Sequence, residues 1–308
     1  MTISLRIGTR GSPLAVAQAN ETRDRLAAAC EGLAVPNSIE IVIIRTSGDR
    51  FQSGPLPQLG GKGLFTKEID DALLSNKIDI AVHSLKDVPI VLPNGLDITC
   101  VLPREDPRDA FLSPAVSSLA ALPNGAIIGT ASLRRKAILH NRWPNLKVAP
   151  IRGNVETRMR KLADGEVDAT LLAMAGLKRL GKAAAATQIL TPEEMLPAVC
   201  QGAIGIECRT GDDATRGLLE PIDDAPTARR VAAERALLSD LGGSCRTPIA
   251  ALAEVVDDGI RFRALIARPD GGGMVETERF GSEADAEVMG RDAADELRRR
   301  AGPEYFAE

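Results

Sequence analysis

Strand and helix signals alternate along the chain and then repeat. We expect strands at residues 5–7, 39–45, 78–82 and 96–101, and again at 126–129, 147–151 and 167–172, with helices near 14–29, 66–75, 133–141 and 155–163. In each series Gly-Thr closes the first strand and a serine opens the helix, which is Ser12 in the first series and Ser132 in the second. Alternating strands and helices predict an α/β fold with largely parallel pairing. The repetition predicts two similar α/β domains that face a cleft.

The pattern changes at about residue 226. A helix at 227–239, strands at 248–256, 260–267 and 274–280, and a helix from about 283 to 300 predict a small C-terminal α+β domain with a three-stranded antiparallel sheet. We therefore predict a discontinuous domain 1 (1–102 and 200–222), domain 2 (103–199) and domain 3 (223–308). Gly271-Gly272-Gly273 is expected to be a turn, because no helix with Lys-Ser/Thr follows it. Two α/β domains around a cleft resemble the architecture of solute-binding proteins.

Composition excludes several classes of protein. Charged residues at 26% and hydrophobic residues at 44% are typical of a globular protein. The longest apolar run, residues 41–44, is only strand-sized, and no stretch of signal-peptide length opens the chain, so we expect a cytoplasmic protein without a membrane partner. Five scattered cysteines without a CxxC pair and two distant histidines predict neither a disulfide framework nor a zinc site. A metal could still bind carboxylates, but nothing in the sequence demands one, so no metal is expected.

Positive charge is concentrated in one part of an acidic chain. The formal net charge is −4, yet residues 130–161 contain nine Lys or Arg and one acid, Glu156. The two helix-opening serines stand beside Arg10 and beside Arg134-Arg135, and helix N-termini attract anions. Aromatic residues are only 3%, which disfavours nucleic acid and favours a small polyanion as the ligand. A solvated basic face on two helices is the alternative interpretation.

One cysteine has the surroundings of an activated thiol. Cys245 lies between Gly242-Gly243-Ser244 and Arg246, where glycines leave room for a bulky group and a guanidinium favours the thiolate. The alternative is a turn that carries a small, half-buried cysteine. The reactive interpretation gains weight from the anion-binding pattern elsewhere in the chain.

Four polar residues also follow a buried strand, and they are His83, Ser84, Lys86 and Asp87 before Pro89. Cleft residues of open α/β sheets lie at such strand exits. Asp87 could act as a general acid or base or as a counter-charge for a cationic intermediate, and Lys86 could bind a carboxylate. Alternatively, Asp87 caps the turn before the proline.

Together these segments resemble the porphobilinogen deaminase (hydroxymethylbilane synthase) family over essentially the whole chain. The most specific matches are residues 60–65 (GGKGLF), 81–89 (AVHSLKDVP), 104–110 (REDPRDA), 132–135 (SLRR), 172–180 (LAMAGLKRL), 201–207 (QGAIGIE) and the loop around Cys245. The resemblance implies a transferase of tetrapyrrole, porphyrin and heme biosynthesis that joins four porphobilinogen molecules head to tail, with loss of ammonia, into hydroxymethylbilane. It also implies a monomer.

The resemblance further implies a role for individual residues. Cys245 would carry a dipyrromethane cofactor through a thioether, and Asp87 would be the catalytic carboxylate. The positions implied for cofactor binding are Lys86, Ser84, Ser132, Arg134, Arg135, Asp49 and Thr130. Those implied for substrate binding are Arg10, Ser12, Gln18, Arg152, Arg158 and Arg179, and Lys62 and Phe65 belong to a flexible loop. Arginine suits the carboxylates of porphobilinogen, because its guanidinium pairs bidentately and stays charged.

The chain departs from the family pattern at three positions. Ser244 precedes the cysteine where many relatives have glycine, Ala131 stands where a second serine is common, and Gln58 stands where lysine is frequent. The alternative function is a non-catalytic two-lobed anion-binding or sensor protein. This alternative explains the basic cluster and the predicted cleft between two α/β domains, but it gives the thiol of Cys245 no function.

Overall fold

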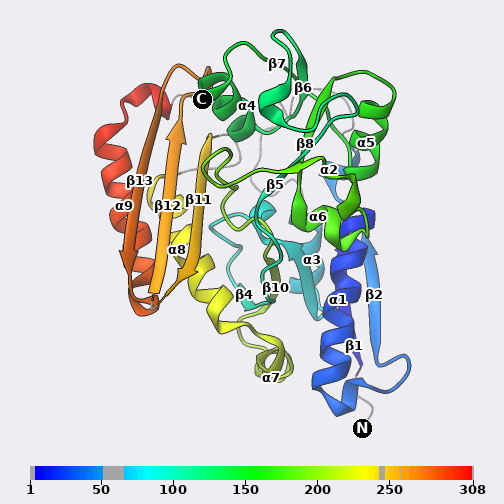
Figure 1. Ribbon diagram of the computed structural model, residues 1–308. Helices are drawn as coiled ribbons and strands as arrows, with labels where there is room; N and C mark the ends of the chain where they lie inside the picture. The colour runs from blue at the N-terminus through cyan, green and yellow to red at the C-terminus, as the bar shows by residue number, and fades with distance from the viewer. Residues whose placement is uncertain (1–3, 51–65, 243–246, 258, 307–308) are drawn as a thin grey trace. The chain divides into compact units, whose positions relative to one another are not determined.

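The computed structural model describes residues 4–50, 66–242, 247–257 and 259–306 (Figure 1). The chain divides into two compact units, of which unit 1 comprises Met1–Arg104 and Ala203–Ala228, and unit 2 comprises Glu105–Gly202 and Arg229–Glu308. No helix in the part of the chain that the structure describes has the length and apolarity needed to cross a membrane.

Unit 1 is built on a five-stranded sheet with the strand order β2-β1-β3-β10-β4. Its strands are β1 (Leu5–Arg10), β2 (Ile39–Ile44), β3 (Ile80–Ser84), β4 (Leu96–Val101) and β10 (Ile204–Arg209). β1 pairs in parallel with β2 and β3, whereas β10 runs antiparallel between β3 and β4. The predicted parallel pairing is confirmed for β1, β2 and β3. The sequence did not predict β10.

Two helices of unit 1 pack on opposite faces of its sheet. Successive side chains of a strand point to opposite faces, and the residues of β3 follow this rule. Ile80 packs in one cluster with Leu26 of α1 (Pro13–Ala29), whereas Ala81 packs in another with Leu73 of α3 (Lys67–Leu74). The unit also contains the short helices α2 (Ser47–Arg50) and α7 (Asp213–Leu219). Together the two faces fix the ends of β1 and β3, from which site residues project.

Unit 2 repeats this sheet with the order β7-β6-β8-β5-β9. Its strands are β5 (Asp109–Leu112), β6 (Ile127–Gly129), β7 (Lys147–Ala149), β8 (Ala169–Ala173) and β9 (Gln188–Ile189), and its helices include α4 (Leu133–Arg142), α5 (Val155–Ala163) and α6 (Met174–Arg179). β6 is parallel to β7 and β8, and β5 is antiparallel to β8 and β9. The two sheets therefore match strand for strand, which confirms the prediction of two similar α/β folds.

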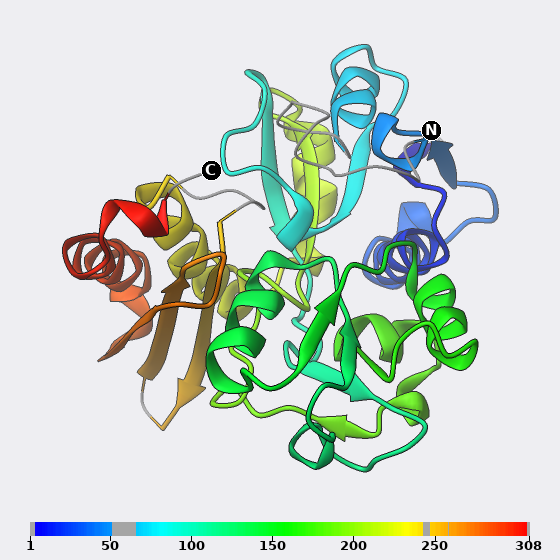
Figure 2. The ribbon, with the colours of Figure 1, turned by 90° about the horizontal axis from the view of Figure 1, so that it is seen from above.

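Unit 2 also contains a three-stranded antiparallel sheet, as predicted. Its strands are β11 (Ile249–Val256), β12 (Gly259–Ala267) and β13 (Met274–Gly281). The helix α9 (Ala286–Arg300) covers one face of this sheet (Figure 2), and α8 (Ala225–Asp240) precedes it in the chain. The glycines at 271–273 form the predicted turn between β12 and β13, where Gly271 has a φ of 78°.

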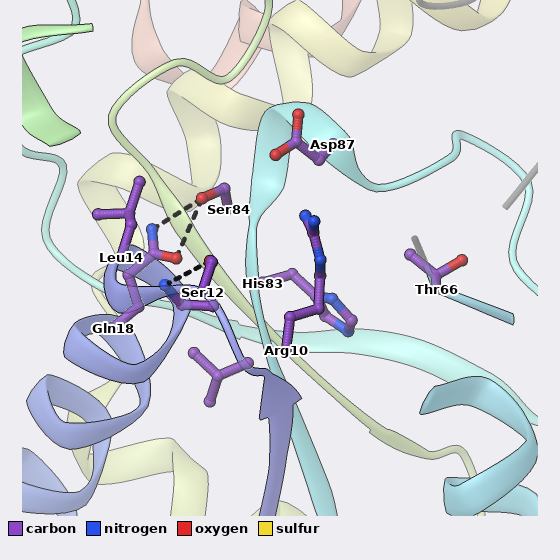
Figure 3. Close-up of a pocket in the computed structure, with 10 residues that line it drawn as sticks. Arg10, Ser12, Leu14, Gln18, Thr66, His83, Ser84 and Asp87 are labelled. Atoms are coloured by element: carbon purple, nitrogen blue, oxygen red, sulfur yellow. Dashed lines mark hydrogen bonds between the residues drawn. The ribbon is translucent and has the colours of Figure 1, made fainter. Parts of the chain in front are cut away.

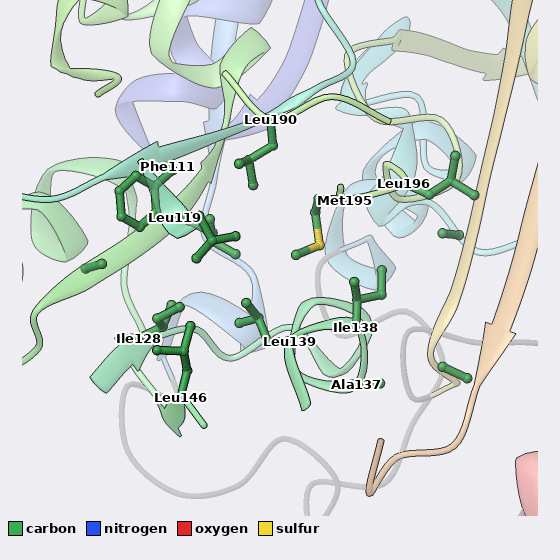
Figure 4. Close-up of a cluster of buried hydrophobic side chains, with 14 of the residues drawn as sticks. Phe111, Leu119, Ile128, Ala137, Ile138, Leu139, Leu146, Leu190, Met195 and Leu196 are labelled. Carbon is green, nitrogen blue, oxygen red and sulfur yellow. The ribbon is translucent and has the colours of Figure 1, made fainter. Parts of the chain in front are cut away.

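A hydrophobic cluster joins the two sheets of unit 2 (Figure 4). Phe111, Ile128 and Leu139 come from the five-stranded sheet and its helix α4, and Leu252 and Leu265 come from the three-stranded sheet. Each fully buried side chain of this size stabilises the fold by about 1.5–3 kcal/mol relative to exposure. The cluster holds α4, whose first turn carries Arg134 and Arg135, on a rigid base.

Candidate active site

A pocket in unit 1 lies where β1 and β3 end and α1 begins (Figure 3). It is lined by Arg10, Ser12, Leu14, Ala15, Gln18, Thr66, Val82, His83, Ser84 and Asp87. The carboxyl ends of parallel strands meet at one edge of a sheet, which is where ligands of open α/β folds bind. The structure thus brings together five of the residues predicted for the site, namely Arg10, Ser12, Gln18, Ser84 and Asp87.

The N-terminus of α1 favours an anion in this pocket. Ser12 caps the helix, and its Oγ accepts a hydrogen bond from the backbone N–H of Ala15 at 3.3 Å. Pro13 occupies the first turn, which contains no acidic residue. The remaining N–H groups and the positive end of the helix dipole therefore act together with the guanidinium of Arg10, which lines the same pocket.

The side chains of Gln18 and Ser84, which both line the pocket, form hydrogen bonds with each other. The amide Nε2 of Gln18 lies 2.9 Å from Ser84 Oγ, and the Ser84 hydroxyl lies 3.0 Å from Gln18 Oε1 (Figure 3). Gln18 is buried on α1, and Ser84 ends β3. This pair connects the helix to the strand whose continuation carries Asp87.

Asp87 presents an ionisable carboxylate to solvent. It ends the 3-10 segment Leu85–Asp87, which is tied to the sheet by the hydrogen bond from Leu85 N–H to the carbonyl of Ala203 at 3.0 Å. The residue is exposed, and its carboxylate makes no hydrogen bond to any described residue. The structure therefore does not support the alternative in which Asp87 caps the turn before Pro89. A carboxylate on a fixed backbone, with no hydrogen-bond partner in the part of the chain that the structure describes, is suited to a cationic ligand.

A buried cluster of ionisable residues lies behind the pocket. His83 Nε2 is 3.0 Å from Glu207 Oε2, and both side chains are buried. Glu207 Oε1 has no hydrogen-bond partner among the described residues. Burial, and then the neighbouring Glu207, raise the pKa of Asp70 to about 6. Sequence reasoning missed this cluster, because its members come from three separate elements, β3, β10 and α3.

Asp70 gives the cluster a measurable pH dependence. Its pKa in the folded protein lies above the ordinary value of 3.8, so its contribution to stability is present below pH 3.8 and is lost as the pH rises through 6. Asp70→Asn is therefore expected to gain about 1 kcal/mol of unfolding free energy over wild type when the pH is raised from about 5 to about 8. Urea unfolding at the two pH values measures this gain. Asp71→Asn, an exposed neighbour on the same helix, should show no such gain. If the unfolding free energies of Asp70→Asn and wild type differed by the same amount at both pH values, the raised pKa of Asp70 would be contradicted.

In unit 2 the two predicted cofactor arginines share one buried carboxylate. Arg134 Nη2 and Arg135 Nη2 each lie 2.7 Å from an oxygen of Asp109, which is fully buried. Arg134 also donates to the carbonyl of Leu196, and Arg135 to that of Leu171. Although burial opposes ionisation, the two guanidinium groups hold the pKa of Asp109 well below its usual range. The group of three carries one net positive charge.

The loop before α4 adds hydroxyl groups beside these arginines. Ser132 caps α4 and accepts from the N–H of Arg135 at 3.4 Å, and Thr130 Oγ1 accepts from the N–H of Ser132 at 3.2 Å. Asp109 receives a further hydrogen bond from Gln201 Nε2 at 2.8 Å. Sequence reasoning included Asp109 and Gln201 only within family motifs, since nothing in the sequence pairs β5 with the start of α4.

The other predicted residues are more scattered. Arg158 Nε donates to the carbonyl of Gly153, and Arg179 Nη1 donates to that of Gly202. Arg152 lies in unit 2, shortly before the start of α5. Asp49 belongs to α2, and its side chain is not among those that the structure describes. Cys245, Lys62 and Phe65 lie outside the described residues.

The fold and this pocket define a class of protein: an α/β protein with two matching sheets and, at the strand ends of unit 1, a pocket that favours an anion and presents an exposed aspartate. Two family models match the chain. The porphobilinogen deaminase dipyrromethane cofactor binding domain matches residues 5–217, and the porphobilinogen deaminase C-terminal domain matches residues 228–299. The chain therefore belongs to the porphobilinogen deaminase family. The predicted family, its transferase activity in tetrapyrrole synthesis and its dipyrromethane cofactor are thereby confirmed.

Curated relatives match this chain over nearly its full length. The chain is 57% identical to the chloroplastic porphobilinogen deaminase of Oryza sativa subsp. japonica over 305 residues, which cover 98% of this chain and 85% of that protein. It is 56% identical to the porphobilinogen deaminase of Paracoccus denitrificans, with 98% and 96% covered. Among solved structures, the methionine-binding protein MetQ is similar with a TM-score of 0.45 and 14% identity, covering 76% of this chain and 96% of that one.

The described residues fit a cofactor that carries carboxylates. Arg134 Nε is buried and has no hydrogen-bond partner among the described residues, although buried donors are rarely left unsatisfied. The guanidinium groups around Asp109 keep a net positive charge next to the hydroxyls of Ser132 and Thr130. These donors suit acetate and propionate groups, and nothing in this donor set calls for a metal ion.

Proposed function

We propose that the chain joins four porphobilinogen molecules head to tail into hydroxymethylbilane, on a dipyrromethane primer held by Cys245 through a thioether. The observation that carries this proposal is the pocket of unit 1, where the exposed carboxylate of Asp87 shares a site with Arg10 and the N-terminus of α1. Cations and helix N–H groups suit the two carboxylates of each substrate. Asp87 is the one acidic side chain among the described residues that line this pocket, and its negative charge suits the positive charge that the reaction creates.

Asp87 is the catalytic residue of this proposal. Loss of ammonia from porphobilinogen leaves an electron-poor pyrrole, and carbon–carbon bond formation moves positive charge onto pyrrole nitrogen. An ionised carboxylate in a fixed position stabilises this charge more strongly than it stabilises the neutral substrate, so it lowers the barrier. The backbone of Asp87 is fixed by the hydrogen bond of Leu85 to Ala203 and by the buried Val88.

The cofactor would be held by hydroxyls and cations. When bound, it supplies the pyrrole carbon to which the first substrate unit is joined. We assign its carboxylates to Lys86, Ser84, Ser132, Thr130, Arg134 and Arg135, with Asp49 as a further contact. Because Arg134 and Arg135 are already bound to Asp109, they would act as an ordered pair with fixed donors. A thioether to Cys245 resists hydrolysis while the chain grows at its far end.

The substrate and the elongating chain would be bound mainly by arginine. We assign this role to Arg10, Arg152, Arg158 and Arg179, with Ser12 and Gln18. Every added unit brings two carboxylates, and guanidinium groups stay charged at any relevant pH. Lys62 and Phe65 would belong to a loop next to the site. We further propose a monomeric, cytoplasmic enzyme with three domains, at 1–102 with 200–222, 103–199 and 223–308.

The test of this function combines stoichiometry with mass. Purified protein is expected to consume four porphobilinogen molecules and release four ammonia molecules for every hydroxymethylbilane formed. Its intact mass should exceed the sequence mass by one dipyrromethane, and the increment should lie on the tryptic peptide 236–246, which contains Cys245. The peptides with Cys30, Cys100, Cys200 and Cys208 are internal controls. Binding of porphobilinogen without its consumption would instead favour the non-catalytic alternative.

A further inference from the structure

His83 has no role in the function proposed so far, although it lines the same pocket as Asp87 (Figure 3). It lies on β3 one residue before Ser84, and its side chain is only 6% exposed. The charged groups around it on neighbouring elements are Arg10 at the end of β1, Glu207 on β10 and Asp70 on α3. A histidine is among the few side chains that can accept and release a proton near neutral pH.

Glu207 orients the imidazole ring. We assign the ring proton to His83 Nε2, 3.0 Å from Glu207 Oε2, because an ionised carboxylate accepts hydrogen bonds and does not donate them. The lone pair then stays on Nδ1. This second nitrogen makes no hydrogen bond to any described residue, and the residue that carries it borders the pocket. A buried carboxylate behind a histidine is the arrangement that prepares imidazole to act as a base.

The reaction needs a proton acceptor in addition to a counter-charge. Each condensation removes one proton from the free α-carbon of a pyrrole. If Asp87 took this proton, it would become neutral and would no longer stabilise the positive charge of the next step. We propose that His83, held by Glu207, accepts the α-carbon proton at Nδ1, so that Asp87 stays ionised through the cycle. This role of His83 rests on the proposed function.

The step balances without any further reagent. Porphobilinogen enters as an ammonium ion, and its carbon–nitrogen bond breaks with both electrons leaving on ammonia. The electron pair of the free α-carbon of the terminal pyrrole forms the new carbon–carbon bond. The α-carbon–hydrogen bond then breaks, its electrons restore the aromatic ring, and the proton moves to His83 Nδ1. The imidazolium passes the proton to ammonia, which leaves as ammonium.

The test measures proton loss directly, with His83→Gln in the cofactor-loaded enzyme. Glutamine can place an amide N–H where Nε2 lies and so keep the bond to Glu207, but it offers no base to the pocket. With porphobilinogen as substrate, kcat is expected to fall by about a hundredfold while KM changes little. With porphobilinogen deuterated at its free α-carbon, the isotope effect on kcat should rise above the wild-type value, because proton loss becomes slower than the other steps.

Two further variants, Glu207→Gln and His140→Gln, are measured beside His83→Gln. Glu207→Gln should move kcat and the isotope effect in the same direction by a smaller factor, since it leaves the base but removes its negative partner. The chain contains one other histidine, and His140→Gln on α4 is the matched control, expected to leave both quantities unchanged. An unchanged kcat in His83→Gln, or a lower kcat with the wild-type isotope effect, would overturn the proposal. Failure of the wild-type protein to consume porphobilinogen would instead refute the proposed function.

Discussion

Asparagine in place of Asp87 is expected to reduce kcat by a factor of about a thousand, because it removes the only charge that the proposal sets against the developing pyrrole cation. The exposed side chain makes no hydrogen bond to the described residues, so its amide analogue should fit the same backbone and leave the fold unchanged. The covalent cofactor should also remain, because its attachment is assigned to Cys245 in another part of the chain.

Single-turnover measurements with loaded Asp87→Asn enzyme separate this effect from binding. The KM for porphobilinogen should change much less than kcat, since the arginines bind the carboxylates of the substrate. Asp24→Asn removes the same charge from an exposed position on α1 and is the control. Turnover within threefold of wild type in Asp87→Asn would reject the catalytic role.

Removal of the Asp109 charge is expected to cause the second large effect. Asp109→Asn leaves two buried guanidinium groups without their carboxylate, and a buried ion pair that loses one partner costs about 3–5 kcal/mol. Whole domains are stable by only about 5–15 kcal/mol, so denaturant midpoints should fall sharply. The variant should also carry less cofactor, which intact mass measures, because Arg134 and Arg135 lose the acceptor that orders them.

The pH dependence of this effect has a defined sign. The pKa of Asp109 is lowered in the folded protein, so its contribution to stability is present above the ordinary value near 3.8 and is lost as the pH falls through the folded value. The difference between wild type and Asp109→Asn should therefore be full at pH 7 and shrink in acid. Asp106→Asn, next to the more exposed Arg108, is the control and should cost about 1 kcal/mol or less. Equal costs for the two variants would contradict the buried-pair argument.

Local patterns predicted most of the helices and strands, but they did not predict two strands whose partners lie far away in the sequence. The helices on which Ser12 and Ser132 are caps begin where expected, because capping residues and apolar periodicity are local signals. The strands β5 and β10 were not predicted from strand patterns. Both run antiparallel inside an otherwise parallel sheet, and their neighbours come from distant parts of the chain. Pairing over such separations leaves no periodic trace in the sequence.

The site residues divide in the same way, into those that local sequence patterns indicate and those whose contacts depend on packing. Asp87 and Arg10 could be singled out because strand exits and basic residues near a helix start are visible in sequence. The burial of Arg134 and Arg135 on Asp109 could not be predicted, since a basic cluster looks the same whether it faces solvent or a buried acid. Glu207 was included only within a family motif, and its contact with His83 was missed because it depends on β10. Interactions across a fold are set by packing, which local patterns do not contain.

The position of β10 in the first sheet has a consequence for synthesis on the ribosome. This strand fills the place between β3 and β4, yet its residues follow the whole of Glu105–Gly202 in the chain. The core of unit 1 needs Ile204, Ile206 and Cys208, so the first hundred or so residues cannot close their sheet as they emerge. Until then β3 and β4 present unpaired edges, and His83 lacks Glu207. The sheet that positions the pocket is therefore completed only late in translation, after the whole of Glu105–Gly202 has been synthesised.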